Sequence, residues 1–236
     1  MDKDVAKRLF REAGLPVVRG RTILRREWES ARREALQSFS ADLGFPCFVK
    51  PANTGSSVGI SKAKSAEDLE KGLDLAFGYD RKALVEIAVD AREIECSVLG
   101  NEIAEASIPG EIIPCNEFYD YEAKYLAEGS KLLIPAPLPS EIAAEVRRLA
   151  VAAFGALDGS GMARVDFFVD RRDGAIYLNE VNTLPGFTPI SMYPKLWEAS
   201  GVTYAALLGR LIQLALDRHR EKGRSASEFR PPSRAG

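Results

Sequence analysis

Two short segments in the C-terminal third of the chain alternate in the pattern of β-strands. Residues 163–169 and 175–181 flank a polar turn at residues 170–174. Because successive side chains of a strand point to opposite faces, the first segment presents a mostly apolar face and a face that carries Arg164 and Asp166. In the second segment, alternation places four residues on one face: Ile176, Leu178, Glu180 and Asn182. A hairpin that pairs like faces therefore brings Asp166 close to Glu180 and Asn182.

Helical spacing of apolar residues predicts several helices around this hairpin. In residues 65–77, Ser65 is a helix cap and Leu69, Leu73 and Phe77 follow along one side. A final helix over residues 203–222 is expected to end at Gly223. Its predicted buried residues are Leu207, Leu208, Leu211, Ile212 and Ala215.

The charges of the predicted hairpin indicate a metal–phosphate site. Two carboxylates facing each other across strands repel and destabilise the pair. A hard divalent cation removes this repulsion, because Mg²⁺ takes carboxylate and amide oxygens and leaves positions for phosphate and water. Arg164, on the same face, is a fixed positive donor for a phosphate or a developing oxyanion. The alternative is a solvated hairpin edge with scattered charge.

A second phosphate-binding pattern lies nearer the N-terminus. A short buried strand ends at Lys50 and Pro51 and is followed by the glycine- and hydroxyl-rich loop 52–60. The backbone N–H groups of such a loop can approach phosphate oxygens, and Lys50 can reach the same phosphates. The lysine precedes the glycines, so this is not a P-loop. A simple turn beside a solvated lysine is the alternative.

Composition narrows the classes of function. The formal net charge of −2 over 236 residues argues against nucleic-acid binding driven by overall charge. No apolar run approaches membrane-spanning length, and residues 1–4 do not begin a signal peptide, so we expect a cytoplasmic protein without a membrane partner. Cys47, Cys96 and Cys115 have no metal-ligand spacing and are interpreted as buried thiols. A single histidine, His219, argues against histidine-based catalysis.

The long connection over residues 110–136 is predicted to be a lid. It contains three tyrosines and a lysine within residues 118–125, a composition that disfavours simple disorder. Long loops inside compact domains are usually functional or disordered.

Five motifs, in order, show a resemblance to the D-alanine–D-alanine ligases of the ATP-grasp superfamily over nearly all of residues 1–222. The motifs are MDK at 1–3, FVKPANTGSSVG at 48–59, FYDYEAKY at 118–125, ARVDFFVD at 163–170 and NEVNTLPGFTPISMYP at 179–194. The resemblance implies an α+β, ATP-grasp fold in which two subdomains, residues 1–93 and 94–222, grip ATP between antiparallel sheets. Residues 223–236 are expected to be a flexible tail.

The resemblance also implies roles for individual residues. The phosphates of ATP would be bound by Lys3, Lys50, Lys124 and the loop at Ser57. The adenine would pack against a hinge at Glu86, Ile87 and Val89, with Glu93 on the ribose. The metal ligands would be Asp166, Glu180 and Asn182. The acyl phosphate and the tetrahedral intermediate would be held by Arg164 and the backbone of Gly186. Ser191 and Met192 would anchor the carboxylate of the second D-alanine, and Ser56 and Tyr125 would form part of a latch that closes the lid.

The activity that the resemblance implies is ATP-dependent ligation of two D-alanines, through an acyl phosphate, for peptidoglycan precursor synthesis. Mg²⁺ or Mn²⁺, as two ions, is the expected metal, and a homodimer is one expected assembly. Family members carry a further α/β domain before the MDK motif, so we expect this chain to correspond to the central and C-terminal domains only. Two alternatives stay open: a non-catalytic ATP-binding remnant and another ATP-grasp carboxylate–amine ligase.

Overall fold

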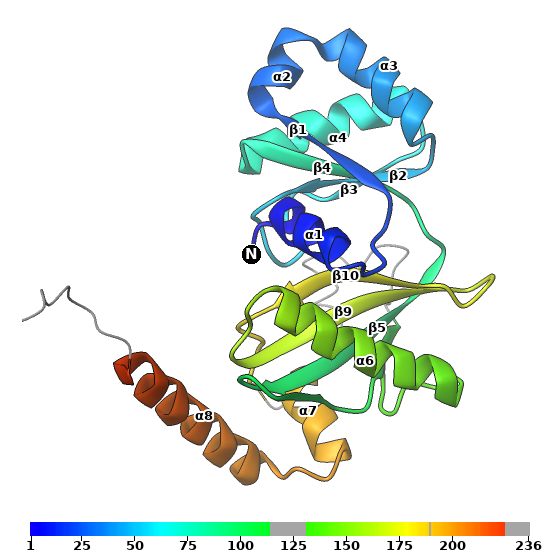
Figure 1. The fold of residues 1–236 in the computed structure, drawn as a ribbon. Helices are drawn as coiled ribbons and strands as arrows, with labels where there is room; N and C mark the ends of the chain where they lie inside the picture. Colours follow the sequence, from blue (N-terminus) through cyan, green and yellow to red (C-terminus); the bar gives the residue numbers. More distant parts are fainter. Residues whose placement is uncertain (114–130, 189, 225–236) are drawn as a thin grey trace, which may run out of the picture.

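The computed structural model describes residues 1–113, 131–188 and 190–224. Within these ranges the strands form two antiparallel sheets, one of four strands and one of six. Figure 1 shows the smaller sheet above the larger one, with the N-terminal helix between them.

The smaller sheet is covered on one side by three helices. Its strand order is β1 (Gly20–Leu24), β4 (Lys82–Ile87), β2 (Cys47–Pro51) and β3 (Ser61–Ala63). The helices are α2 (Arg25–Ser30), α3 (Arg32–Asp42) and α4 (Ala66–Tyr79). Trp28, Phe39 and Leu73 from these helices pack with Val49 and Val85 of the sheet in one apolar cluster. The cap predicted at Ser65 is confirmed, because its hydroxyl accepts a hydrogen bond of 3.2 Å from the Asp68 N–H.

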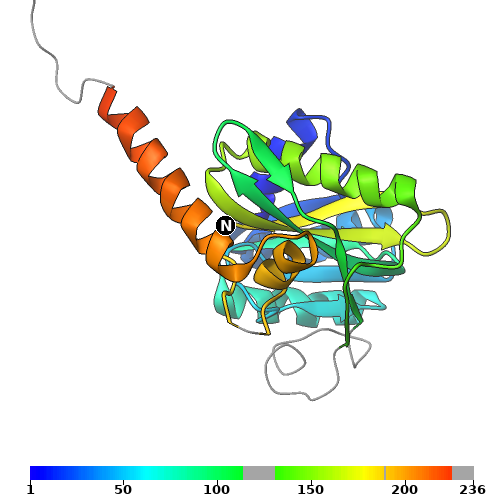
Figure 2. The ribbon, with the colours of Figure 1, turned by 90° about the horizontal axis from the view of Figure 1, so that it is seen from below.

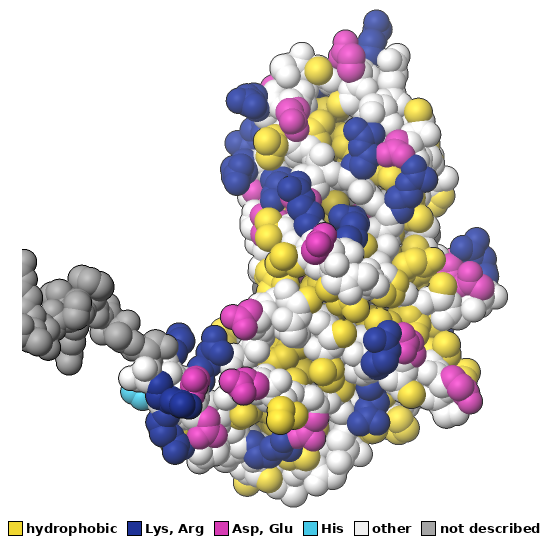
Figure 3. Space-filling view, viewed as in Figure 1, with side chains coloured by type: hydrophobic (Ala, Val, Ile, Leu, Met, Phe, Trp, Pro, Cys, Tyr) yellow, Lys and Arg dark blue, Asp and Glu magenta, His cyan; other side chains and the backbone are white. Residues whose placement is uncertain are grey.

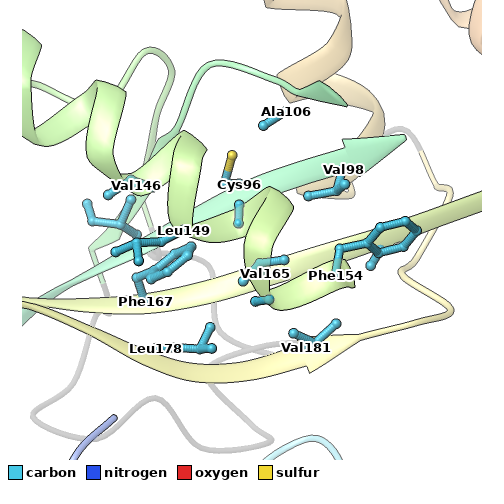
Figure 4. Packing of buried hydrophobic residues seen from close by; sticks show 14 of the residues in the cluster. Cys96, Val98, Ala106, Val146, Leu149, Phe154, Val165, Phe167, Leu178 and Val181 are labelled. Atoms are coloured by element: carbon cyan, nitrogen blue, oxygen red, sulfur yellow. The ribbon is translucent and has the colours of Figure 1, made fainter. Parts of the chain in front are cut away.

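The larger sheet has helices on both faces. Its strand order is β10 (Ile176–Asn182), β9 (Gly161–Asp170), β5 (Ala91–Gly100), β7 (Gly110–Ile113) and β8 (Lys131–Leu133), with β6 (Ala104–Ala106) on the free part of β5. Figure 4 shows α6 (Ser140–Ala156) packing Leu149 and Phe154 towards Val165 and Phe167. On the opposite face, Ser97 donates a hydrogen bond to the Tyr193 carbonyl of α7 (Met192–Ala199). The apolar face of the predicted hairpin therefore lies in a core, and its polar face does not.

Helix α1 (Lys3–Glu12) contacts both sheets. Ala6 and Phe10 lie in the apolar cluster of the larger sheet. Asp4 and Lys7 instead make ion pairs with Lys82 and Glu86 of the smaller sheet. The chain changes sheets in residues 88–90, between β4 and β5. The subdomain bounds 1–93 and 94–222 stay a prediction, because α1 belongs partly to each unit.

Helix α8 (Tyr204–Arg224) extends away from the body of the molecule (Figures 1 and 2). Leu207 is buried as predicted and Leu211 is partly buried, but the prediction of burial for Leu208, Ile212 and Ala215 is wrong. The apolar cluster at α7 covers α8 only near its start, which explains this difference. The helix also continues through Gly223 to Arg224, and residues 225–236 of the predicted tail lie outside the described residues.

Membrane-spanning potential and surface charge add little to this picture. Among the described residues, each helix taken singly is too short or too polar to cross a membrane, and only the bent pair α7 and α8 passes that test together. On the face shown in Figure 3, basic and acidic side chains are interspersed.

Cys47 and Cys96 are buried free thiols, and burial raises their pKa values to about 11 and about 12. Cys115 lies outside the described residues.

Candidate functional site

A cavity of about 540 Å³ opens between the β9–β10 hairpin, the loop after β2 and the segment that leads into α7. Eight of the predicted site residues line it: Lys3, Ser56, Arg164, Glu180, Asn182, Gly186, Ser191 and Met192. Segments that are far apart in the sequence thus contribute to one wall, as the resemblance implied.

The register of the hairpin confirms that Asp166 and Glu180 are neighbours. Their Cα atoms are direct partners across β9 and β10, and Asn182 is the partner of Arg164. A β-bulge between Leu178 and Glu180 adds Asn179 to β10. As a result Leu178 lies in the core while Glu180 lines the cavity, so the prediction that these two residues share a face is wrong.

Arg164, in the wall of the cavity, contacts the carboxylates of Asp166 behind it and of Glu95 beside it. Its Nε and Nη2 donate to the two carboxylate oxygens of Asp166 at 2.7 and 2.8 Å, and Nε also lies 3.1 Å from Oε2 of Glu95. Burial opposes the charged form of Arg164, but Asp166 and Glu95 outweigh it and hold the pKa of the guanidinium well above its ordinary value. Arg164 is therefore a permanent positive charge.

The donor set fits a hard divalent cation. Asp166, Glu180 and Asn182 supply two carboxylates and one amide oxygen, which are the ligands that Mg²⁺ and Mn²⁺ accept. In the part of the chain that the structure describes, no group of three or more His, Cys, Asp or Glu side chains is arranged to hold a metal ion. The predicted set contains only two such residues, so its role as a metal site stays a prediction.

Two lysines approach the cavity from different elements. Lys3 Nζ donates to the Thr54 carbonyl at 2.5 Å and lies 3.8 Å from Oε2 of Glu180, so it joins the loop to the hairpin. Lys50, at the end of β2, pairs with Glu86 at 2.8 Å and donates to Oδ1 of Asn179 at 3.4 Å. Lys50 is 8% exposed and sits just behind the wall that Asn179 forms.

The loop after β2 has a constrained backbone. Ser56 and Ser57 both have positive φ angles, of 52° and 60°, which are uncommon for residues other than glycine. The start of the loop is fixed by Asn53, whose backbone N–H and side-chain amide both donate to Oδ2 of Asp80 at 2.8 and 2.9 Å. Such local strain is found at ligand-binding segments, and the contact of this loop with phosphates stays a prediction.

The opposite end of the cavity is built by the segment before α7. Ser191 precedes the first residue of the helix, and its hydroxyl accepts a hydrogen bond from the Thr188 N–H at 3.0 Å. Its side chain makes no capping bond to α7, and the third residue of the helix, Pro194, has no N–H, so the N–H groups of Met192 and Tyr193 are the first-turn donors that a ligand could use. Together with Met192 in the same wall, this arrangement suits a carboxylate.

Other predicted residues lie elsewhere. The wall of this cavity, as far as the described residues form it, does not include Lys50, Ser57, Glu86, Ile87, Val89, Glu93 or Asp166. Glu86 is 1% exposed and its carboxylate lies between Lys7 and Lys50. Ile87 ends β4, and Glu93 lies on β5 opposite Phe168. Lys124 and Tyr125 are outside the described residues.

Sequence reasoning missed two participants. Asn179 lines the cavity only because of the bulge, for which alternation gives no signal. The sequence alone does not set Glu95 apart from the nearby carboxylate of Glu93, but in the structure Glu95 lies 3.1 Å from Nε of Arg164 and lines the cavity, which Glu93 does not. The three-dimensional pairing of β5 with β9 was needed to make that distinction.

Comparison with known proteins gives matches along nearly the whole chain. Residues 9–213 match the family model described as D-ala D-ala ligase C-terminus. The chain is 54% identical to the D-alanine–D-alanine ligase of Heliobacterium modesticaldum over 98% of its own length and 63% of that protein. It is 60% identical to the same enzyme of Thermoanaerobacter sp. over 95% of its length and 62% of the relative.

Solved structures of D-alanine–D-alanine and D-alanine–D-serine ligases also match this chain. The D-alanine-D-alanine ligase from Coxiella burnetii matches with a TM-score of 0.81 and 38% identity, over 94% of this chain and 59% of that one. The VanG D-Ala:D-Ser ligase from Enterococcus faecalis matches with a TM-score of 0.81 and 36% identity, over 91% and 61%. The predicted α+β, ATP-grasp class is confirmed. The chain spans less than two thirds of the length of these relatives, and it belongs to the D-alanine–D-alanine ligase family.

Proposed function

We propose that this protein joins two D-alanines to D-alanyl-D-alanine at the expense of ATP, through an acyl phosphate, as a step in the synthesis of peptidoglycan precursors. The observation that carries the proposal is one cavity with two chemically different ends. One end has Arg164 and Lys3 beside the Asp166–Glu180 pair, and the other has the uncapped start of α7. The family assignment supports the same reaction.

The first half of the reaction needs positive charge around the terminal phosphates of ATP. The carboxylate of the first D-alanine attacks the γ-phosphate of ATP, the bond to the β-phosphate breaks and ADP leaves, while Lys3 and Lys50 stabilise the charge that spreads over the transferred oxygens. Asp166, Glu180 and Asn182 would hold Mg²⁺ or Mn²⁺, as two ions, which supply further charge neutralisation when bound. The loop at Ser56 and Ser57 would contact the same phosphates.

In the second half of the reaction the neutral amine of the second D-alanine attacks the carbonyl carbon of the acyl phosphate. The amide C–N bond forms, the C–O bond to the phosphate breaks, and inorganic phosphate and a proton are released. Arg164 and the backbone of Gly186 would hold the oxygen that becomes negatively charged. The start of α7, with Ser191 and Met192, would hold the carboxylate of the second D-alanine. Its amine would then stay within contact distance of the acyl phosphate. The lid predicted within residues 110–136, of which residues 114–130 with Lys124 and Tyr125 lie outside the described residues, would exclude water from the acyl phosphate.

Several finer assignments belong to the same proposal. The adenine would lie against residues 86–89 and the ribose at Glu93. We further infer a cytoplasmic location, no membrane or nucleic-acid partner, and a homodimer as the assembly to test first. We also infer that the two subdomains span residues 1–93 and 94–222.

The proposal is tested by measuring phosphate release from ATP with Mg²⁺ as D-alanine is added, with the dipeptide identified by mass spectrometry. We expect release that depends on D-alanine and not on L-alanine. Glu180→Gln should lower the rate at least about a hundredfold, because it removes a carboxylate that would hold the metal ion. A parallel assay with D-serine as the second substrate tests for D-Ala:D-Ser ligation, the activity that the name of the VanG relative gives.

A second candidate is a nucleotide-binding protein without ligase activity. ATP binding without D-alanine-dependent phosphate release would support this candidate and contradict the first. Release that depends on another carboxylate or amine would support a different ATP-grasp ligase.

A further inference from the structure

Lys7 is a buried ammonium group to which the proposed reaction gives no role. It projects from α1 and is 1% exposed. Its Nζ lies 2.5 Å from Oε1 of Glu86, and the other oxygen of that carboxylate lies 2.8 Å from Nζ of Lys50. Three elements that are distant in the sequence, α1, β4 and β2, thus meet in one ion cluster.

The cluster of Lys7, Lys50 and Glu86 has a net positive charge. Two ammonium groups share one carboxylate, so the formal charge of the cluster is +1. Lys7 lies at the end of the cluster that is buried in the protein, whereas Lys50 lies at the end nearer the cavity, where it contacts Asn179 of the cavity wall. Buried charges are normally compensated, and an anion in the cavity next to Asn179 would compensate this one.

A purely structural role for Lys7 would be to fasten α1 to the smaller sheet. That role is already filled by Lys82, whose Nζ lies 2.6 Å from Oδ2 of Asp2 and 3.1 Å from Oδ2 of Asp4. Thr22 of β1 adds a hydrogen bond of 2.8 Å to Asp4. The helix is therefore anchored at its first turn without Lys7.

We propose that Lys7 is a positioning residue for Lys50, acting through Glu86. By pairing with the Glu86 carboxylate, Lys7 leaves the charge of Lys50 available to the phosphates of a nucleotide. Without Lys7, Glu86 becomes the sole counter-ion of Lys50, and an incoming phosphate must compete with it. This inference rests on the proposed nucleotide site and adds to it a residue outside the cavity wall.

The test measures binding of ATP with Mg²⁺ and, separately, of adenosine to the whole chain by titration calorimetry. Lys7→Met keeps the side-chain length and removes the charge. We expect it to weaken ATP binding about tenfold, since a unit charge interaction at a few ångströms in a partly desolvated site is worth at least that much. Adenosine has no phosphate, so its affinity should stay within about twofold of the parent chain.

Restoring the charge balance separates positioning from mere stability. The double variant Lys7→Met/Glu86→Gln leaves Lys50 without a competing carboxylate, and it should regain most of the lost ATP affinity. Lys82→Met removes another buried ammonium that holds α1, and it should change ATP affinity by less than about twofold, since its partners do not touch Lys50. Thermal unfolding of each variant confirms that it is folded.

Several results would overturn the inference. These are an unchanged ATP affinity in Lys7→Met, a folded double variant that binds no better than the single one, or an equal loss in Lys82→Met. If Lys7→Met does not fold, Glu86→Gln is compared with the double variant: equal ATP affinities support positioning through Glu86, and a weaker double variant contradicts it. A parent chain that binds no ATP would overturn the proposed function as well, and that failure appears before any substitution is made.

Discussion

At Gly186 the space for a side chain is already occupied. A Cβ built on this residue would lie 2.8 Å from Oγ of Ser191, closer than ordinary contacts allow. The same Ser191 hydroxyl is held by Thr188, so it has little freedom to move aside. The absent side chain therefore preserves the position of Ser191 at the start of α7.

This geometry predicts a selective effect of Gly186→Ala. We expect the KM for D-alanine to rise about tenfold, because displacement of Ser191 by a fraction of an ångström weakens a hydrogen-bonded site by about 1.4 kcal/mol. The free energy of unfolding should change by less than about 0.5 kcal/mol, as at other exposed positions. Steady-state kinetics and urea unfolding measure the two effects.

Gly55→Ala is the matched control for that substitution. Gly55 lines the same cavity, but a Cβ there would meet nothing within 4 Å. We expect a KM close to that of the parent chain. Equal rises of KM in both variants would show that any added methyl group in the cavity interferes, and the specific contact with Ser191 would lose its support.

Among the elements, strand β10 decides how the chemistry is arranged. Its first half sends Leu178 into the core, and after the bulge Glu180 and Asn182 line the cavity while Val181 returns to the core. A strand with strict alternation would place Glu180 on the same face as Leu178. The extra residue Asn179 thus lets one strand serve both a core and a charged site.

Deleting Asn179 should be far more damaging than replacing it. The deletion restores strict alternation, so either Glu180 enters the core or Leu178 leaves it, and we expect a loss of about 3 kcal/mol or more in the free energy of unfolding. Asn179→Ala keeps the bulge and removes only the long hydrogen bond to Lys50, at a cost of about 1 kcal/mol or less. Denaturant unfolding of both variants makes the comparison, and equal losses would contradict this account of the bulge.

Local patterns predicted which residues meet in the hairpin but not every face that they occupy. Alternation alone, continued from the pair Leu178 and Phe167, would place Glu180 opposite Val165, and only the bulge brings it opposite Asp166. It could not reveal the bulge, which depends on how β10 fits the core. For α8 the apolar spacing was real, yet burial of Ile212 depends on whether another element covers it, and within the described chain Ile212 is 63% exposed.

The exposure of α8 leads to a direct prediction for Ile212→Glu. Because this side chain packs little in the described structure, the free energy of unfolding should fall by less than about 0.5 kcal/mol. Leu207→Glu, at a fully buried position in the same helix, should lose several times more. Thermal unfolding of the two variants measures the difference, and a large loss at Ile212 would mean that the helix packs differently in solution.

At the scale of the whole molecule, the two sheets are joined by charge as well as by apolar contacts. Lys7, Glu86 and Lys50 connect α1 to the smaller sheet, and Asn179 extends the chain of contacts to the larger one. No single stretch of sequence contains this network, so periodicity and motifs could not predict it. The resemblance supplied Lys50 and Glu86 as separate site residues, and only the fold shows that they share a proton-sensitive cluster.

Glu86 makes this connection dependent on pH. Burial by itself would raise the pKa of its carboxyl, but the ammonium groups of Lys50 and Lys7 outweigh burial and lower it to about 2. Burial lowers the pKa of Lys7, because it disfavours the charged ammonium, and the Glu86 carboxylate raises it. An acid whose pKa is lower in the folded chain stabilises the fold above its ordinary pKa of 4.5, and that contribution disappears as the pH falls towards 2.

The final prediction follows from that sign. Glu86→Gln should lower the free energy of unfolding at pH 7 by about 3 kcal/mol, because it leaves buried ammonium groups without their carboxylate. The difference between parent and variant should be constant from pH 7 to 5 and shrink below pH 4.5, where the parent begins to lose the contribution of Glu86. Urea unfolding at pH 7, 5, 4 and 3 measures this difference directly.

An exposed carboxylate provides the contrast for that experiment. Glu67 pairs with Lys71 on the surface of α4, where both side chains are more than two thirds exposed, and Glu67→Gln should cost less than about 0.5 kcal/mol at any of these pH values. A Glu86→Gln deficit that stayed the same from pH 7 to pH 3 would mean that the lost stability comes from packing around the substituted side chain. In that case the ion cluster would not be what couples the fold to protonation.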